Sequence, residues 1–123
     1  MAKKVTKKGG KKMNQIGLVG RLVREVELKK IGEDRVVINN TLAVAKRSKK
    51  ENGPQADFIP IVAWGNVAKL MQLYCEKGHM IGVTGRIQSR SYINKEEENI
   101  FIVEMVVEEV YFLQNKKAEP ITG

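Results

Sequence analysis

The stretch that decides the fold is Phe58–Gly78, FIPIVAWGNVAKLMQLYCEKG, in which a strand pattern passes directly into a helix pattern. Its first seven residues are apolar, most of them β-branched or aromatic, which is typical of a strand. Asn66 is a residue type that caps helix N-termini, and Gly78 is one that follows helix C-termini. Between them, apolar residues recur at the spacing of one buried helix face: Val67, Leu70, Met71 and Tyr74. We therefore predict a strand over 58–64, followed by a helix of about three turns.

Further strands are predicted on both sides of this segment because β-branched and apolar residues alternate there with polar ones. The five predicted strands are residues 16–28, 36–44, 58–64, 80–92 and 100–113. Residues 29–34, 46–55 and 94–99 are polar and are predicted to be connections. The order of three strands, one helix and two strands is that of the OB-fold. We therefore predict an all-β fold with one helix: a five-stranded Greek-key barrel with the helix between strands 3 and 4.

Charge is distributed unevenly along the 123 residues, which suffice for one domain. The net charge is +8, but six lysines lie in the first twelve residues, whereas residues 13–115 hold 14 basic and 13 acidic side chains. We expect residues 1–12 to be a disordered basic arm, 13–114 the OB-fold domain and 115–123 a short polar tail. Neither a secretory signal nor an apolar run near the roughly 20 residues that span a bilayer is present, so we expect a cytoplasmic protein without membrane contact.

Strand alternation places aromatic and cationic side chains on the outside of the predicted barrel. Phe58 and Trp64 share one side of their strand, opposite the expected interior residues, and Arg86, Arg90 and Tyr92 share one side of the next. Any one of these aromatics is more often a packing residue. Together they favour binding of single-stranded nucleic acid, whose bases stack on aromatic rings while cations neutralise the phosphates.

Five segments resemble the bacterial single-stranded DNA-binding proteins, in order and with the expected spacing. They are Asn14–Leu22 (NQIGLVGRL), Asn40–Ala45 (NTLAVA), Ala56–Gly65 (ADFIPIVAWG), Lys77–Gly78 and Val83–Tyr92 (VTGRIQSRSY). The resemblance implies an OB-fold, usually in a homotetramer. It also implies sequence-independent binding and protection of single-stranded DNA on the nucleoid during replication, recombination and repair.

The resemblance also assigns site residues. Phe58, Trp64 and Tyr92 fall on the base-stacking positions, whereas Ser48 stands near a position where the family has a further aromatic. We expect phosphate contacts from cations on the strands and in the loop: Arg21, Lys46, Arg47, Lys49, Lys50, Arg86 and Arg90. Family members commonly continue into a tail with an acidic tip that recruits partner enzymes. The present chain ends without one, so such recruitment is not expected.

Two other functions remain open from the sequence. One is an OB-fold accessory of primosomal or replication-restart type, whose aromatic face binds a protein. The other is a metal-dependent nuclease using Glu96–Glu98, Glu104, Glu108 and Glu109, although these glutamates lack the spacing of a metal site and are expected in a solvated turn and strand edge. His79 is expected at the surface and Cys75 as a packing residue or a free thiol. No nucleotide-binding motif is present, so we expect a non-catalytic protein without metal or cofactor.

Overall fold

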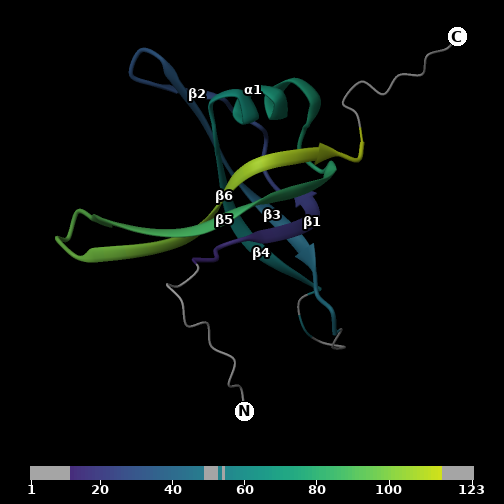
Figure 1. Cartoon of the computed structure of the whole chain (residues 1–123). Coiled ribbons are helices and arrows are strands. Elements are labelled where there is room, and N and C mark those ends of the chain that lie inside the picture. Colours follow the sequence, from purple (N-terminus) through teal and green to yellow (C-terminus); the bar gives the residue numbers. More distant parts are fainter. Residues whose placement is uncertain (1–11, 49–52, 54, 115–123) are drawn as a thin grey trace, which may run out of the picture.

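Six strands and one helix make up the computed structural model, which describes residues 12–48, 53 and 55–114 (Figure 1). The elements in chain order are β1 (Ile16–Leu22), β2 (Lys29–Ile31), β3 (Arg35–Ala45), β4 (Ala56–Trp64), α1 (Gly65–Tyr74), β5 (Met80–Ile93) and β6 (Asn99–Phe112). The proposed basic arm and polar tail lie almost wholly outside the described residues. Within the described ranges, no helix is long and apolar enough to cross a membrane.

The five long strands close into a barrel. Their order is β1–β5–β6–β4–β3, and β1 pairs again with β3 through Arg21 opposite Ala43 and Leu22 opposite Leu42. All pairs are antiparallel except β4–β6, where Ile61 lies opposite Met105. The predicted five-stranded OB barrel is therefore confirmed. Its helix follows the third long strand, which is numbered β4 because the short β2 precedes it.

Side chains that alternate inward fill the barrel. Ile38 and Leu42 of β3, Ile61 and Ala63 of β4 and the inward residues of β5 and β6 belong to one buried cluster. Helix α1 packs against β3, β4 and β6 and adds Ala68 and Met71 to this core. The buried helix face differs from the predicted one, because Leu70 and Tyr74 are exposed while Ala68 and Cys75 are buried. Cys75 is thus a packing residue, as predicted.

The first predicted strand ends six residues early, and the buried amide of Asn40 explains this. The Asn40 Oδ1 atom accepts a hydrogen bond from the Arg24 N–H, and its Nδ2 donates to the carbonyls of Arg24 and Glu25. These bonds hold residues that would otherwise pair with a neighbouring strand. The chain then turns into β2, which pairs with β3, so the predicted break at 29–34 is in fact a short hairpin.

Both predicted helix caps are wrong. The helix begins at Gly65, and the N-cap residue Trp64 forms no side-chain capping bond. It ends at Tyr74, where the Cys75 N–H donates to the Met71 carbonyl. Gly78 instead turns the chain into β5 with a φ of 90° while its N–H donates to the Leu22 carbonyl. A glycine is needed there for its left-handed backbone, not for ending the helix.

Candidate nucleic-acid interface

The predicted aromatic and cationic positions lie on one side of the sheet, here called the outer face. In β-ladders, residues directly opposite each other point to the same side. Arg86 lies opposite Val106, Val106 opposite Val62, and Trp64 opposite Val37. The outer face therefore comprises Arg86, Gln88, Arg90 and Tyr92 of β5; Ile100, Ile102, Glu104 and Val106 of β6; Phe58, Pro60, Val62 and Trp64 of β4; and Val37, Asn39, Thr41 and Ala43 of β3.

The three predicted stacking residues are all exposed on this face. Phe58 is 61%, Trp64 37% and Tyr92 47% exposed. Between Trp64 and the β5 cations, Val62 belongs to the outer face but is buried, since Val37 and Val106 flank it. Tyr92 lies on the β5–β6 hairpin, which projects far from the barrel (Figure 1). The three rings are thus spread along the outer face, and buried valine side chains lie between them.

Trp64 has a contact that the sequence reasoning missed. The Arg35 guanidinium carbon lies 4.4 Å from the centroid of the Trp64 ring, a cation–π arrangement. Arg35 is the first residue of β3, and its neighbour two positions on, Val37, is the strand partner of Trp64. Alternation would have placed Arg35 on the outer face had the strand predicted over 36–44 begun one residue earlier. Its contact with Trp64 depends on the register between β3 and β4, which alternation does not give.

Three of the predicted phosphate-binding cations are already paired with carboxylates of the same chain. The Lys46 Nζ lies 2.6 Å from Asp57 Oδ1, the Arg86 Nη1 2.8 Å from Glu108 Oε2, and the Arg90 Nε 2.9 Å from Glu104 Oε2. The Lys46–Asp57 and Arg86–Glu108 pairs are partly exposed on both sides and contribute little stability, so an anionic ligand can compete for their cations. The Glu104 side chain, in contrast, is only 5% exposed. The face therefore presents alternating charge around its aromatic rings instead of a uniformly positive surface.

The remaining predicted cations are placed differently. Arg21 lies opposite Ala43, which in turn lies opposite Phe58, and its Nη1 donates to the Gly78 carbonyl at 3.0 Å. Arg47 is exposed in the loop after β3. Lys49 and Lys50 lie outside the described residues.

Glu104 is the acidic group buried in the outer face. Its side chain is only 5% exposed and accepts hydrogen bonds from the Gln88 Nε2 at 2.8 Å and the Arg90 Nε at 2.9 Å. Burial favours the protonated carboxyl, but the hydrogen bonds from Arg90 and Gln88, with the Arg90 charge, favour the carboxylate more. The net effect lowers the pKa of Glu104 below its ordinary value of 4.5. Glu104 thereby fixes the positions of two polar side chains on the face.

This carboxylate predicts an acid-dependent loss of stability. Because its pKa is lower in the folded state, the unfolded chain binds more protons between that pKa and 4.5. The stabilisation is therefore fully present above pH 4.5 and disappears as the pH falls through the folded pKa. Urea unfolding at neutral pH and at successively lower pH should show a smaller acid loss for Glu104→Gln than for the wild type. Glu97→Gln, in the exposed turn, should lose as much as the wild type, and equal losses in all three proteins would contradict this role.

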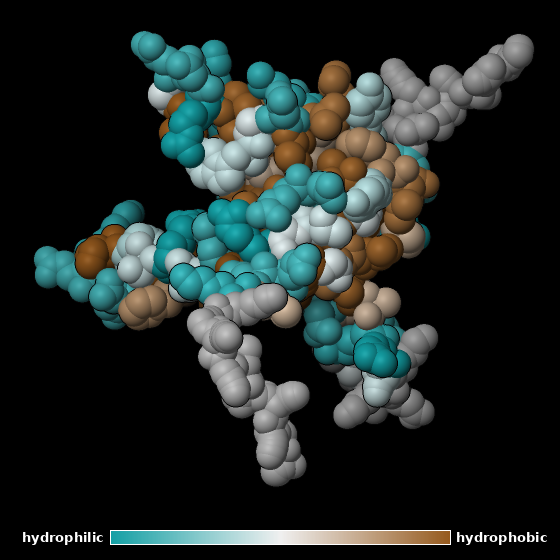
Figure 2. All heavy atoms as spheres, viewed as in Figure 1, coloured by the Kyte–Doolittle hydropathy of each residue, from teal (hydrophilic) through white to brown (hydrophobic). Residues whose placement is uncertain are grey.

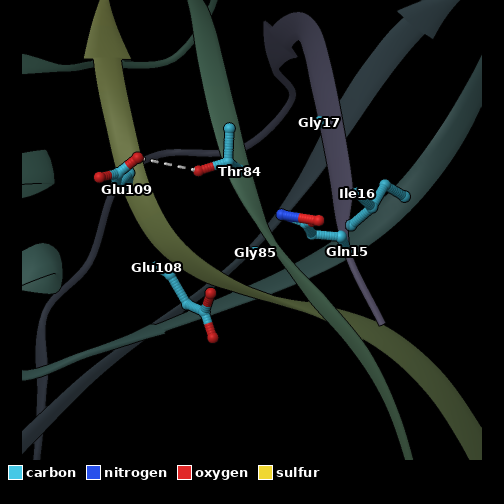
Figure 3. Close-up of a pocket in the computed structure, with 7 residues that line it drawn as sticks. All are labelled: Gln15, Ile16, Gly17, Thr84, Gly85, Glu108 and Glu109. Atoms are coloured by element: carbon cyan, nitrogen blue, oxygen red, sulfur yellow. Dashed lines mark hydrogen bonds between the residues drawn. The ribbon is translucent and has the colours of Figure 1, made fainter. Parts of the chain in front are cut away.

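A hollow of about 540 Å³ lies apart from the aromatic rings, between β1, β5 and β6 (Figure 3). It is lined by Gln15, Ile16, Gly17, Thr84, Gly85, Glu108 and Glu109. Figure 3 shows the Thr84 hydroxyl bonded to Glu109 across the two strands, and Tyr111 bonds the same carboxylate. None of these lining residues is cationic, so the hollow offers no partner to a phosphate group.

The glutamates and the histidine that were not expected to form a site have structural roles. The Asn94 Oδ1 atom accepts the backbone N–H groups of Glu96 and Glu98 and organises the turn between β5 and β6. Among residues 12–48, 53 and 55–114, no three His, Cys, Asp or Glu side chains lie close enough to hold a metal ion. His79 is only partly at the surface, where it was predicted. Its side chain is largely buried, and its Nδ1 accepts the Glu76 N–H.

Comparison with known proteins gives one consistent result. The model of the Single-strand binding protein family matches residues 13–113. Single-stranded DNA-binding protein 3 of Clostridium acetobutylicum is 48% identical over 103 residues, covering 83% of this chain and 72% of its own. Single-stranded DNA-binding protein B of Bacillus subtilis is 38% identical over 107 residues, covering 86% and 95%.

The barrel also matches a solved structure, a Plasmodium falciparum SSB in complex with ssDNA. The TM-score is 0.73 over 87% of this chain and 100% of the other, at 24% identity. At that identity the likeness concerns the fold.

Proposed function

Since this chain belongs to the single-strand binding protein family, we propose that it binds single-stranded DNA through the outer face, without choosing among sequences. It acts as a coat that protects DNA during replication, recombination and repair, and it catalyses no reaction. Its place is the cytoplasm, on the nucleoid, where its ligand lies.

One observation carries this proposal: three exposed aromatic side chains share one continuous sheet face with arginine side chains of β1, β3 and β5. Unstacked bases lie flat on Phe58, Trp64 and Tyr92, because every base has a π-face. The phosphates between them take Arg86 from Glu108 and Lys46 from Asp57. Arg90 stays on the buried Glu104 and binds phosphate through its remaining N–H donors. Stacking without hydrogen bonds to base edges explains the lack of sequence selectivity.

Titration with oligo(dT) tests the proposal, because Trp64 is the chain's single tryptophan. Stacking of a base on the indole ring is expected to quench its fluorescence. A mixed-sequence strand of equal length should quench comparably, while a duplex of that length should not, since paired bases cannot stack on the ring. A folded protein whose Trp64 signal ignores oligo(dT) would contradict the proposed function.

We further propose that the chain assembles as a homotetramer. Large apolar side chains are also exposed beyond the residues that make up the outer face: Val19, Leu70, Leu73, Tyr74, Tyr111 and Leu113. The Tyr74 and Phe112 rings lie 5.3 Å apart, so α1 adjoins the end of β6, and Figure 2 shows hydrophobic residues gathered on the barrel near α1. Such surfaces mark interaction sites. Light scattering on the same samples, with and without oligo(dT), should give the mass of four chains, and a monomer mass would contradict the assembly.

A further inference from the structure

The short β2–β3 hairpin extends the outer face beyond Trp64. Lys29 lies opposite Val37 and Ile31 opposite Arg35. Since Val37 is also the partner of Trp64, Lys29 and Arg35 point to the same side as the Trp64 ring. Lys30 lies opposite Val36, which packs on the barrel core, so it belongs to the other side of the hairpin. Figure 1 shows this hairpin projecting past the barrel.

The charges of Arg35 and Lys29 are unpaired, in contrast to those of Arg86 and Arg90 on the same face. Lys46, Arg86 and Arg90 each form an ion pair. Among residues 12–48, 53 and 55–114, neither Arg35 nor Lys29 has a carboxylate partner or a side-chain hydrogen bond. The contact of Arg35 with the Trp64 ring leaves its N–H donors unpaired. Neither cation has to leave an intramolecular partner before it binds an anion.

We propose that the side of the β2–β3 hairpin that carries Lys29 and Arg35 extends the outer face and binds phosphates of the single strand. Arg35 holds the phosphate next to the base that stacks on Trp64, and Lys29 holds the following one. The proposal rests on the proposed function and adds a site to it. The guanidinium suits this place because it can lie against an aromatic ring while its N–H donors bind phosphate oxygens. A different role for Arg35, covering the Trp64 ring against solvent, predicts tighter base stacking once the side chain is removed.

The salt dependence of binding separates these roles. The dissociation constant of a fluorescently labelled oligo(dT) is measured by anisotropy over a series of NaCl concentrations. For single strands, each phosphate contact contributes about 0.7 to the slope of log affinity against log salt. Arg35→Ala and Lys29→Ala should each reduce the slope by about 0.7 and weaken binding most at low salt. Arg35→Lys, which keeps the charge, should retain the wild-type slope.

Lys30→Ala is the matched control, because it removes the same charge from the same hairpin on the opposite side and should leave the slope unchanged. Circular dichroism confirms that each variant is folded. Wild-type slopes in both Arg35→Ala and Lys29→Ala, or tighter binding by Arg35→Ala, would overturn the extension while leaving the proposed function intact. Failure of the wild type to bind oligo(dT) would instead overturn the proposed function itself.

Discussion

Replacement of Trp64 by alanine is expected to weaken oligo(dT) binding by about 1–3 kcal/mol, the range known for aromatic residues in single-strand-binding OB-folds. Phe58→Ala should cost a similar amount, and the double variant should cost more than either, because Phe58 and Trp64 lie six residues apart on β4 and serve different bases. Trp64→Ala removes the chain's single tryptophan, so binding is followed by anisotropy of a labelled strand. Tyr92→Ala extends the series onto the β5–β6 hairpin.

The same hairpin offers a control for exposure. Phe101 is 72% exposed, more than any of the three stacking residues, but it lies opposite Ser91 on the side of the hairpin that faces away from Tyr92. Phe101→Ala should therefore leave the affinity unchanged. If Phe101→Ala weakened binding as much as Tyr92→Ala, the affinity would depend on the exposure of an aromatic ring and not on its position on the outer face. If none of the face variants weakened binding, the rings would be ordinary surface residues.

Gly85→Ala is expected to lower the free energy of unfolding by about 3 kcal/mol or more. Gly85 lies at a β-bulge in which Val107 pairs with Gly85 and Glu109 with Thr84, leaving Glu108 as the extra residue. A methyl group at Gly85 would overlap the carbonyl oxygen of Val106 on the neighbouring strand. Gly85 and Val106 both belong to paired strands, so the two backbones cannot move apart without breaking strand hydrogen bonds. Urea unfolding, followed by circular dichroism, measures the loss.

Gly82→Ala is the matched variant on the same strand. A methyl group there would meet the Tyr111 Cβ at 3.6 Å, which is an ordinary contact, so its cost should be much smaller. Equal losses for the two variants would mean that the bulge tolerates a side chain and that glycine at 85 is needed for another reason.

Local patterns were sufficient for most of the fold. The alternation over 58–64 correctly separated Ile61 and Ala63, which are buried in the barrel, from Phe58 and Trp64. Periodicity located the helix, but its caps and part of its buried face were wrong because contacts with β3, β4 and β6 select which residues are covered. The end of the first strand at Leu22 could not be predicted from neighbouring residues either, because it depends on the amide of Asn40 in a different strand.

The sequence by itself determined the order of the five long strands and the helix, and the side of β4 on which Phe58 and Trp64 lie. Both follow from alternation and periodicity, which are properties of neighbouring residues. The tertiary structure alone decided that Lys46, Arg86 and Arg90 are paired with carboxylates while Arg35 lies against Trp64. These contacts depend on the register between strands, which the closed barrel sets through its whole hydrogen-bonded network and its shared core.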